Sequence, residues 1–262
     1  MNNSSTYERI LQNLKFLRSK ESLAVLDETL DYINHNNLPF IEGYLRLTEA
    51  EVALKKSNLI SHSVMRAGFP TVKTIEEFDF EFQPTINKEQ IFDLNSLRFI
   101  EKKENIIFYG NSGVGKTHLA ISLGVTAAQN RKSTYFIKCQ RLIETLKKAK
   151  AENRLTERLK KFSGYKLLII DEFGYLPIHP EDAKLLFQII DQRYEKNSII
   201  LTTNIGFSNW GELLGDNLIA GAILDRLLHH SKVISIKGPS YRLKEHNIRL
   251  EKQLDPVVQP HD

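Results

Sequence analysis

The residues best suited to chemistry form a glycine-rich stretch from Gly110 to Thr117. Its spacing, G-x-x-x-x-G-K-T, is typical of a loop that binds phosphate groups. Glycines let backbone N–H groups turn inward toward an anion, and the positive end of a following helix adds to the attraction. Lys116 can then reach the β- and γ-phosphates of a nucleotide, while the Thr117 hydroxyl can hold Mg²⁺. The alternative is a glycine-rich turn with an unrelated lysine. Under the first interpretation the nucleotide contacts come from Gly110, Asn111, Ser112, Gly113, Val114, Gly115, Lys116, Thr117 and the next residue, His118.

A pair of carboxylates follows a short apolar run further along the chain. Leu167–Ile170 reads as a buried strand, and Asp171 and Glu172 stand at its carboxyl end. Ligands of open parallel sheets bind at that edge. We expect Asp171 to hold Mg²⁺, directly or through a water, and Glu172 to orient and polarise an attacking water. The alternative is a strand that ends in two acidic turn residues.

Two further polar residues are ambiguous when only their types and positions are considered. Asn204 stands just after the apolar run Ile199–Thr202, where an amide can hold a water or the γ-phosphate, but asparagine is also a common turn residue. Arg226 lies on a helical stretch, and a guanidinium suits the charge that develops during phosphoryl transfer. The residues by themselves favour the turn for Asn204, and for Arg226 a surface pair with Asp225 or Asp191.

Positive charge is concentrated in one segment, residues 138–166. It holds ten Lys or Arg and three Glu, a net charge of +7 in a chain whose total is +4. Arg154, Arg158 and Lys161 recur on one face of a predicted helix, beside an apolar face. A solvated helix face is the alternative, but the imbalance of sign favours binding to the phosphates of nucleic acid, tolerant of sequence and weakened by salt. The candidate DNA contacts are Lys147, Lys148, Lys150, Arg154, Arg158, Lys160 and Lys161.

Alternating elements must position these residues. Short apolar runs are predicted as strands, and the stretches between them are long enough to be crossover helices, which implies a parallel sheet covered on both faces. The predicted strands are 106–109, 133–137, 167–170, 199–202 and 233–236, and the predicted helices are 117–129, 141–162, 181–194 and 218–230.

The chain ahead of this pattern is different. Residues 1–64 are predicted as a small helical domain with a role in DNA binding, partner binding or self-assembly. Residues 65–94 form a connector rich in phenylalanine, which we expect to pack on the core. The nucleotide-binding domain is predicted over 95–248, followed by a polar tail, 249–262.

Composition excludes several classes of protein. With 262 residues, 41% hydrophobic and 26% charged, the chain has ample material for a core and is not intrinsically disordered. No apolar stretch approaches the length of a membrane span, so we expect no membrane association. The polar start and the single cysteine, Cys139, indicate a cytoplasmic protein without a secretory signal or an internal disulfide.

With these residues in hand, the sequence resembles the IstB family of insertion-sequence transposition helper ATPases. The resemblance spans about residues 40–245. It is carried by the stretches GNSGVGKTHLAISLG, LLIIDEFGYLPI, ILTTN and LIAGAILDRLLHHS, then SYRLKEH. That family belongs to the AAA+ ATPases and is related to the DnaC-type helicase loaders. The implied fold is an α/β P-loop NTPase: a three-layer αβα core with a parallel sheet, preceded by a small all-α domain.

The resemblance also implies roles for individual residues. Lys116 and Thr117 match the Walker A lysine and threonine, and Asp171 and Glu172 match Walker B. Asn204 aligns with the sensor 1 asparagine. The remaining two positions carry arginines: Arg226 falls on the arginine finger, which reaches the nucleotide of the next subunit, and Arg242 falls on the sensor 2 arginine. For Asn204 and Arg226 the resemblance therefore reverses the interpretation from residue type.

The implied function is an ATPase that uses ATP and Mg²⁺, assembles as a homo-oligomer with ATP sites shared between subunits, and binds double-stranded DNA. In that family the assembly recruits and stimulates a partner transposase but does not cut or join DNA itself. Three alternatives stay open: a DnaC-type replicative helicase loader, a DNA-binding scaffold that holds ATP only as a structural ligand, and a metabolic P-loop kinase. A kinase would need an acceptor pocket and a lid, of which the sequence gives no sign.

Overall fold

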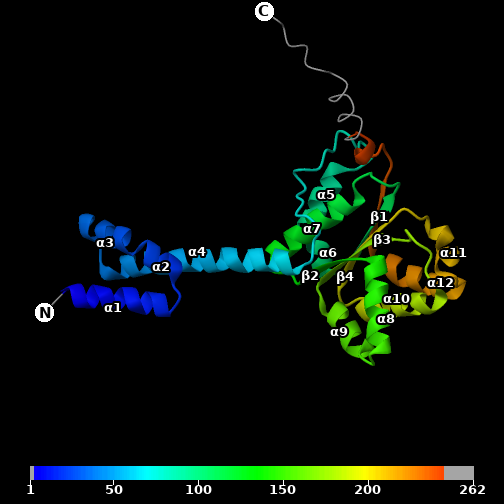
Figure 1. Ribbon diagram of the computed structural model, residues 1–262. Helices are drawn as coiled ribbons and strands as arrows, with labels where there is room; N and C mark the ends of the chain where they lie inside the picture. Colours follow the sequence, from blue (N-terminus) through cyan, green and yellow to red (C-terminus); the bar gives the residue numbers. More distant parts are fainter. Residues whose placement is uncertain (1–2, 245–262) are drawn as a thin grey trace, which may run out of the picture. The chain divides into compact units, whose positions relative to one another are not determined.

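The chain divides into two compact units, Met1–His62 and Ser63–Asp262, in a computed structural model that describes residues 3–244. The predicted tail, 249–262, lies outside the described residues. The first unit is helical, as expected: α1 (Asn3–Phe16), α2 (Lys20–Ala24), α3 (Leu26–His35) and most of α4 (Phe40–Arg66), which contains the boundary (Figure 1).

A buried carboxylate organises the N-terminal unit. Glu51 of α4 is 8% exposed and accepts hydrogen bonds from the backbone N–H groups of Glu21 (3.0 Å) and Ser22 (3.3 Å) at the start of α2. The Ser22 hydroxyl donates to the Leu47 carbonyl at 2.9 Å. These groups would otherwise be unpaired donors at a helix N-terminus, so Glu51 acts as a cap supplied by another helix.

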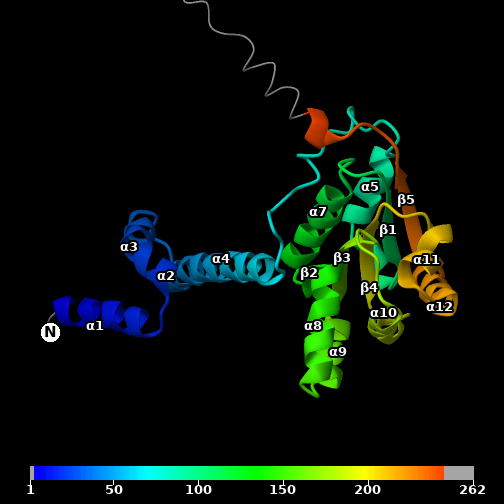
Figure 2. The same ribbon diagram turned by 45° about the vertical axis from the view of Figure 1, so that its right-hand side comes forward.

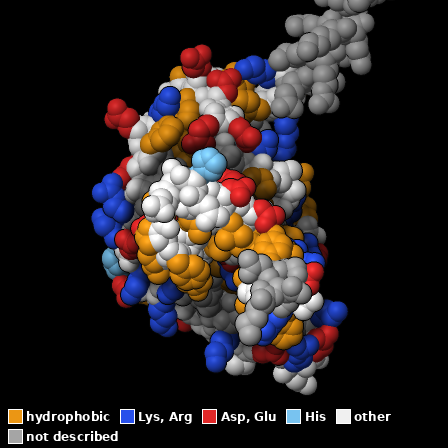
Figure 3. All heavy atoms as spheres, turned by 90° about the vertical axis from the view of Figure 1, so that its left-hand side faces the viewer, with side chains coloured by type: hydrophobic (Ala, Val, Ile, Leu, Met, Phe, Trp, Pro, Cys, Tyr) orange, Lys and Arg blue, Asp and Glu red, His pale blue; other side chains and the backbone are white. Residues whose placement is uncertain are grey.

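Apolar side chains gather on the surface of this unit (Figure 3). The most exposed are Phe16 at 87%, Phe40 at 77% and Leu17 at 65%. The unit has seven Lys or Arg and eight Asp or Glu, so its formal charge is −1. Its surface is therefore not the basic surface that a phosphate backbone attracts.

The second unit is built on a parallel sheet in the order β2-β3-β4-β1-β5. Its strands are β1 (Asn105–Gly110), β2 (Thr134–Lys138), β3 (Leu167–Phe173), β4 (Ser198–Thr203) and β5 (Ser231–Ile236). All four pairings are parallel, as the continuous apolar runs predict. The carboxyl ends of β1, β3 and β4 meet in the middle of the sheet, so the polar residues that follow them lie at one edge.

Helices cover both faces of this sheet, which gives three layers (Figures 1 and 2). Alternate strand residues point to opposite sides: Ile106, Phe108 and Ile200 lie in one buried cluster, and Ile107 and Leu201 lie in the other. The first cluster contains α5 (Lys88–Asn95), α6 (Arg98–Glu101) and α7 (Lys116–Gln129). The second contains α8 (Cys139–Ala151), α9 (Leu155–Gly164), α10 (Pro180–Arg193), α11 (Trp210–Leu214) and α12 (Asn217–Leu228), with the 3-10 turn η1 (Phe207–Asn209) packed beside them.

One predicted element is wrong in detail. The stretch 141–162, expected to be one crossover helix, is two helices, α8 and α9. Asn153 between them has a φ of +55°, a left-handed conformation that asparagine tolerates and that ends a helix. The break lets both helices pack on the sheet, since Leu146 of α8 and Leu159 of α9 are buried in the same cluster.

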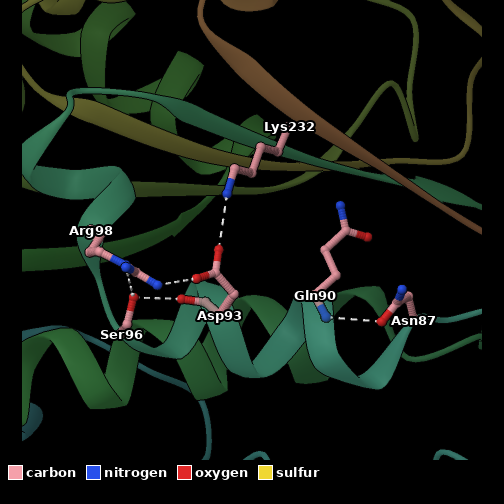
Figure 4. A network of polar contacts seen from close by, with 6 residues as sticks. All are labelled: Asn87, Gln90, Asp93, Ser96, Arg98 and Lys232. Carbon is pink, nitrogen blue, oxygen red and sulfur yellow. Dashed lines mark hydrogen bonds and ion pairs between the residues drawn. The ribbon is translucent and has the colours of Figure 1, made fainter.

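The connector packs on the core, and its last helix is tied to the sheet by charge. Asp93 of α5 forms ion pairs with Arg98 (2.5 Å) and with Lys232 of β5 (3.2 Å), and Asn87 caps the same helix by accepting from the Gln90 N–H (Figure 4). The hydrogen bond from Arg98, followed by that from Lys232, lowers the pKa of Asp93. Helix α5 spans the predicted boundary between residues 94 and 95.

Two titratable side chains, those of Arg193 and Cys139, are buried in the second unit. Arg193 is 1% exposed and donates to three backbone carbonyls, those of Phe162 (2.7 Å), Ser163 (3.2 Å) and Ser198 (2.6 Å). Burial lowers its pKa to about 9, which still leaves it protonated at neutral pH. Cys139 is 3% exposed, and burial raises its pKa to about 12, so its thiol is unreactive in the folded chain.

Within residues 3–244, no helix combines the length and the apolar character that crossing a lipid bilayer requires.

Candidate nucleotide site

The phosphate loop connects β1 to α7 in the arrangement that its sequence predicts. The Lys116 ammonium group donates hydrogen bonds to the carbonyls of Gly110 (2.7 Å) and Asn111 (2.6 Å), so it bends back over the loop. Burial lowers the pKa of Lys116, Asp171 opposes this shift, and the charge of Arg242 adds to it. A cation held over a phosphate loop at the start of a helix fits a polyphosphate, which would replace the carbonyls as the partner of Lys116.

Two glycines in the loop are required by their surroundings. Gly110 has a φ of +154°, and a Cβ there would lie 2.2 Å from the Ile236 carbonyl oxygen. Gly113 has a φ of +80°, and a Cβ there would lie 2.1 Å from the Ser240 hydroxyl. The loop is therefore closely packed against the end of β5 and the segment that follows it, and larger side chains would displace it.

The two residues expected to hold Mg²⁺ lie side by side. The Thr117 hydroxyl donates to Asp171 Oδ1 at 2.8 Å, and the Thr202 hydroxyl donates to the same oxygen at 2.6 Å. Burial is the main cause that raises the pKa of Asp171, and these two hydrogen bonds oppose it. A carboxylate beside a threonine hydroxyl is an oxygen donor set of the kind that Mg²⁺ prefers.

Glu172 is presented by an irregularity in the sheet. The β3–β4 register shifts between Ile170 and Phe173, and Glu172 has a φ of +57°. Its backbone N–H donates to the Thr202 hydroxyl at 3.0 Å. A bulge turns a side chain away from the direction that strand alternation would give it, and here Glu172 lines the phosphate-loop cavity.

The carboxylate of Glu172 is also paired. Lys138, at the carboxyl end of β2, approaches Glu172 Oε2 to 2.8 Å, with side chains 55% and 37% exposed. The hydrogen bond that Lys138 donates to Glu172 raises the pKa of Lys138, so the ammonium stays charged across the neutral range. Because β2 leads directly into α8, Lys138 connects the carboxylate expected to orient water with the first helix of the basic segment.

A cavity of about 500 Å³ lies beside these groups, a volume in the range of small-molecule sites. Asp171 and Lys138 are not among the described residues that line it. Its walls include the phosphate loop, Glu172, Asn204 and Arg242, so four separated parts of the sequence converge there. The connector supplies a further wall, with Thr71, Lys73, Glu77, Phe78 and Asp79. His118, which we expect to contact nucleotide, also lines the cavity, and its Nε2 lies 2.8 Å from the Thr74 carbonyl oxygen.

The segment that carries Arg242 is fastened to both the loop and the connector. The Tyr241 N–H donates to the Gly113 carbonyl at 2.9 Å, while its hydroxyl donates to the Asp79 carbonyl. Gln83 donates to the Pro239 carbonyl at 2.7 Å. The connector and this segment therefore close one side of the cavity together.

Arg226 lies elsewhere. Its Nε donates to Asp191 of α10 at 2.7 Å, and its guanidinium lies 4.7 Å from the centre of the Phe187 ring. The described residues that line the phosphate-loop cavity do not include Arg226. The surface pair with Asp191 that residue type favours is therefore present in the single chain.

The seven candidate DNA contacts lie on α8 and α9 or between them. Three of them are paired: Lys147 with Asp182 (3.1 Å), Lys148 with Glu152 (3.9 Å) and Arg154 with Glu157 (3.1 Å). The other four form no ion pair within residues 3–244, namely Lys150, Arg158, Lys160 and Lys161. Leu159 and Phe162 are buried beneath them, as the apolar face predicts.

Sequence reasoning misses several residues of the site. Thr202 falls in a predicted strand without a role, although its position in the strand next to Asp171 is a usable signal. Lys138 stands out only as one of many basic residues, since the bulge that turns Glu172 toward it leaves no sequence signature. The connector's phenylalanines indicate packing, but not that Phe78 lines the cavity.

These features define the class of protein: a P-loop NTPase, with a parallel sheet, a phosphate loop after β1 and two acidic residues near the carboxyl end of β3. The structure of AMPPCP-bound DnaA from Aquifex aeolicus has the same fold, with a TM-score of 0.51 and 19% identity over 71% of this chain and 57% of that one. The family model for the IstB-like ATP binding protein matches residues 13–248, and the chain belongs to this family.

Two relatives are similar along nearly their whole length. A protein of insertion sequence IS232 from Bacillus thuringiensis subsp. berliner, named as ATP-binding, is 55% identical over 242 residues, which are 92% of this chain and 97% of the relative. A protein of insertion sequence IS5376 from Geobacillus stearothermophilus, also named as ATP-binding, is 45% identical over 225 residues, 86% of this chain and 90% of the relative.

Proposed function

We propose that this protein hydrolyses ATP to ADP and phosphate and uses the nucleotide to regulate its assembly on double-stranded DNA. The observation that carries the proposal is the junction at Asp171, which joins Thr117 of the phosphate loop to Thr202 of the neighbouring strand. Lys116 holds the β- and γ-phosphates, and Glu172 orients the attacking water. Asn204 and Arg242 contact the γ-phosphate side of the cavity.

Thr117 and Asp171 would hold Mg²⁺, which when bound offsets the negative charge of the phosphates. The chain's own residues do the positioning. The bulge after Ile170 lets Asp171 stay buried while the next residue, Glu172, reaches the cavity. Burial raises the pKa of Asp171. A cation bound beside it would oppose this shift, because a nearby positive charge favours the charged carboxylate.

Assembly would bring an arginine, Arg226 of a neighbouring subunit, to the phosphate-loop cavity. Arg226 stands on α12, 28% exposed and held by Asp191. In the assembled state we expect it to leave this pair and reach the nucleotide of the neighbouring subunit. An arginine supplied by a neighbour stabilises transition-state charge and couples turnover to contact between subunits.

The basic surface of α8 and α9 is the proposed DNA contact. Four of its cations are without a carboxylate partner among residues 3–244, and the apolar side of each helix is buried, so the charges face solvent. Phosphate contacts of this kind are independent of base sequence. The names of the relatives, which place them in insertion sequences, support a transposase as the protein that the assembly recruits. The chain itself would neither cut nor join DNA.

Phosphate release tests the hydrolytic step. Glu172→Gln should bind ATP but turn over poorly, and its DNA complex should persist; Lys116→Ala should lose ATP binding. Wild-type turnover in Glu172→Gln would remove the assigned role of that carboxylate. If the purified chain binds ATP but never releases phosphate, with or without DNA, the nucleotide is a structural ligand.

A mixing experiment tests the shared site. Arg226→Ala should retain ATP binding and lose turnover, and Lys116→Ala should lose both. A mixture of the two variants contains sites with an intact phosphate loop next to an intact Arg226, so some activity should return. Absence of rescue at every mixing ratio would show that Arg226 does not act between subunits.

Salt dependence tests the DNA surface. The double variant Lys160→Ala/Lys161→Ala should lower the slope of log affinity against log salt, by up to about 0.9 for each phosphate that is no longer neutralised. The matched control is Lys102→Ala/Lys103→Ala, an exposed lysine pair at the end of α6. An equal change in both double variants would mean that only overall charge matters.

A further inference from the structure

The residues that follow Arg226 carry chemistry that the proposed function does not use. His229 and His230 follow the end of α12, and Glu195 follows the end of α10. Each of the three can offer one ligand atom, and these atoms all lie within 4.8 Å of one another. We propose that Glu195, His229 and His230 form a binding site for a divalent transition-metal ion, with Zn²⁺ as the best fit.

The backbone holds the three residues in place. The rings of His229 and His230 lie 3.9 Å apart, centre to centre, in the turn between α12 and β5. The His230 carbonyl accepts from the Asn105 N–H at 2.7 Å, which anchors this turn to the start of β1. Glu195 has a φ of +56°, a conformation that a non-glycine residue rarely adopts without a structural reason.

The spacing of the ligand atoms suits the ion. His230 Nε2 and Glu195 Oε1 are 3.3 Å apart, long for a hydrogen bond. Bonds of about 2.1 Å to a tetrahedral Zn²⁺ place two ligand atoms roughly 3.4 Å apart. An ion can therefore sit between these two atoms with little movement, and the ligand atom of His229 lies within 4.8 Å of both.

A neighbouring side chain orients the second imidazole. The Tyr194 hydroxyl lies 2.6 Å from His229 Nδ1, and the two rings are stacked. When His229 donates from Nδ1 to this hydroxyl, the lone pair of Nε2 is free to bind the ion. A hydrogen bond on the other ring nitrogen is the usual support of a histidine that binds metal. Two imidazoles, one carboxylate and a water complete four-coordination.

The location gives the site a structural consequence. Glu195 belongs to the end of α10 and the histidines to the end of α12, the helix that carries Arg226 one turn earlier. A bound ion would link the two helix ends on the side where Arg226 pairs with Asp191. The site stands on these contacts alone, whether or not Arg226 acts between subunits.

The test is zinc binding by the full chain, without a histidine tag, measured by competition with a chromophoric chelator. We expect one Zn²⁺ per chain, lost in His229→Ala/His230→Ala. Glu195→Gln, an exposed change that preserves shape, should weaken binding by at least about tenfold, and Tyr194→Phe by about tenfold, as expected when a metal ligand is deprived of its support. The control His246→Ala/His261→Ala, outside the described residues, should bind as wild type does.

Several results would overturn the proposal. One is the absence of binding at micromolar Zn²⁺. Another is binding that survives His229→Ala/His230→Ala or disappears in His246→Ala/His261→Ala. A third is a zinc-induced doubling of mass in sedimentation, which would place the ion between chains. An unchanged affinity for Zn²⁺ in Glu195→Gln would show that the Glu195 carboxylate does not bind the ion. Circular dichroism of each variant separates loss of ligands from loss of fold.

Discussion

Because Lys138 pairs with Glu172, we expect the isolated protein to turn over ATP more slowly than it would with Glu172 unpaired. While Glu172 is held by the lysine, its carboxylate is less free to orient water. Lys138→Met removes the charge and keeps most of the side chain's length. We expect it to raise the turnover number measured without DNA.

The size of the increase follows from the exposure of the pair. The N···O distance is 2.8 Å, but the side chains are 55% and 37% exposed, so solvent screens the attraction. Pairs of this kind contribute about 0.2–1 kcal/mol, which corresponds to an increase of roughly 1.5- to 5-fold. The difference should shrink toward about 1 M salt, where the screening length falls to roughly 3 Å.

The assay is phosphate release at saturating ATP, across a series of salt concentrations. Lys184→Met is the matched control, because Lys184 is 54% exposed and also pairs with a glutamate, on the surface of α10. Equal turnover in Lys138→Met, with ATP binding intact, would show that Lys138 does not restrain Glu172. Lower turnover would mean that Lys138 assists Glu172 in orienting water. An equal rise in Lys184→Met would attribute the effect to net charge.

Three further variants test the packing around the site. Asp171→Asn should abolish Mg²⁺-dependent turnover yet raise the melting temperature without Mg²⁺. Because burial raises the pKa of Asp171, the charged carboxylate destabilises the fold above that pKa, and the gain in melting temperature should vanish as the pH falls through the pKa. A lower melting temperature of the variant at neutral pH would contradict this. Thr202→Val removes a donor to Asp171 and the acceptor of the Glu172 N–H, so the free energy of unfolding should fall by about 1–3 kcal/mol and turnover should drop; wild-type turnover would show that Asp171 needs only Thr117. Arg193→Met removes a donor from the buried carbonyls of Phe162 and Ser198, while Ser163 still accepts from Asn197, and should lower the free energy of unfolding by about 3 kcal/mol or more in denaturant titration; a loss below about 1 kcal/mol would mean that water replaces the guanidinium.

Much of the fold is predictable because it follows from local patterns. Continuous apolar runs indicate the strands to within a few residues, and the parallel sheet is confirmed. The break between α8 and α9 is not predictable in this way, because the apolar period of residues 141–162 continues on both sides of Asn153, and only its positive φ divides the two helices.

The site is predictable where each residue follows its strand directly. Thr117 and Asp171 are 54 residues apart in sequence, but both stand at the carboxyl edge of the sheet, and their oxygens are in contact. The contacts of Lys138 and Tyr241 are not predictable, because they depend on the bulge at Glu172 and on the path of the segment after β5. The roles of Lys116, Thr117, Asp171 and Glu172 in catalysis, like those of Asn204, Arg226 and Arg242, remain predictions.

The burial of Cys139 makes the chain a convenient object for thiol chemistry. It is the protein's single cysteine, and maleimide reagents will find no reactive sulfur on the native surface. One cysteine introduced at an exposed position can therefore carry a fluorophore without first replacing Cys139. Slow alkylation of Cys139 itself would then measure how often the first turn of α8 opens.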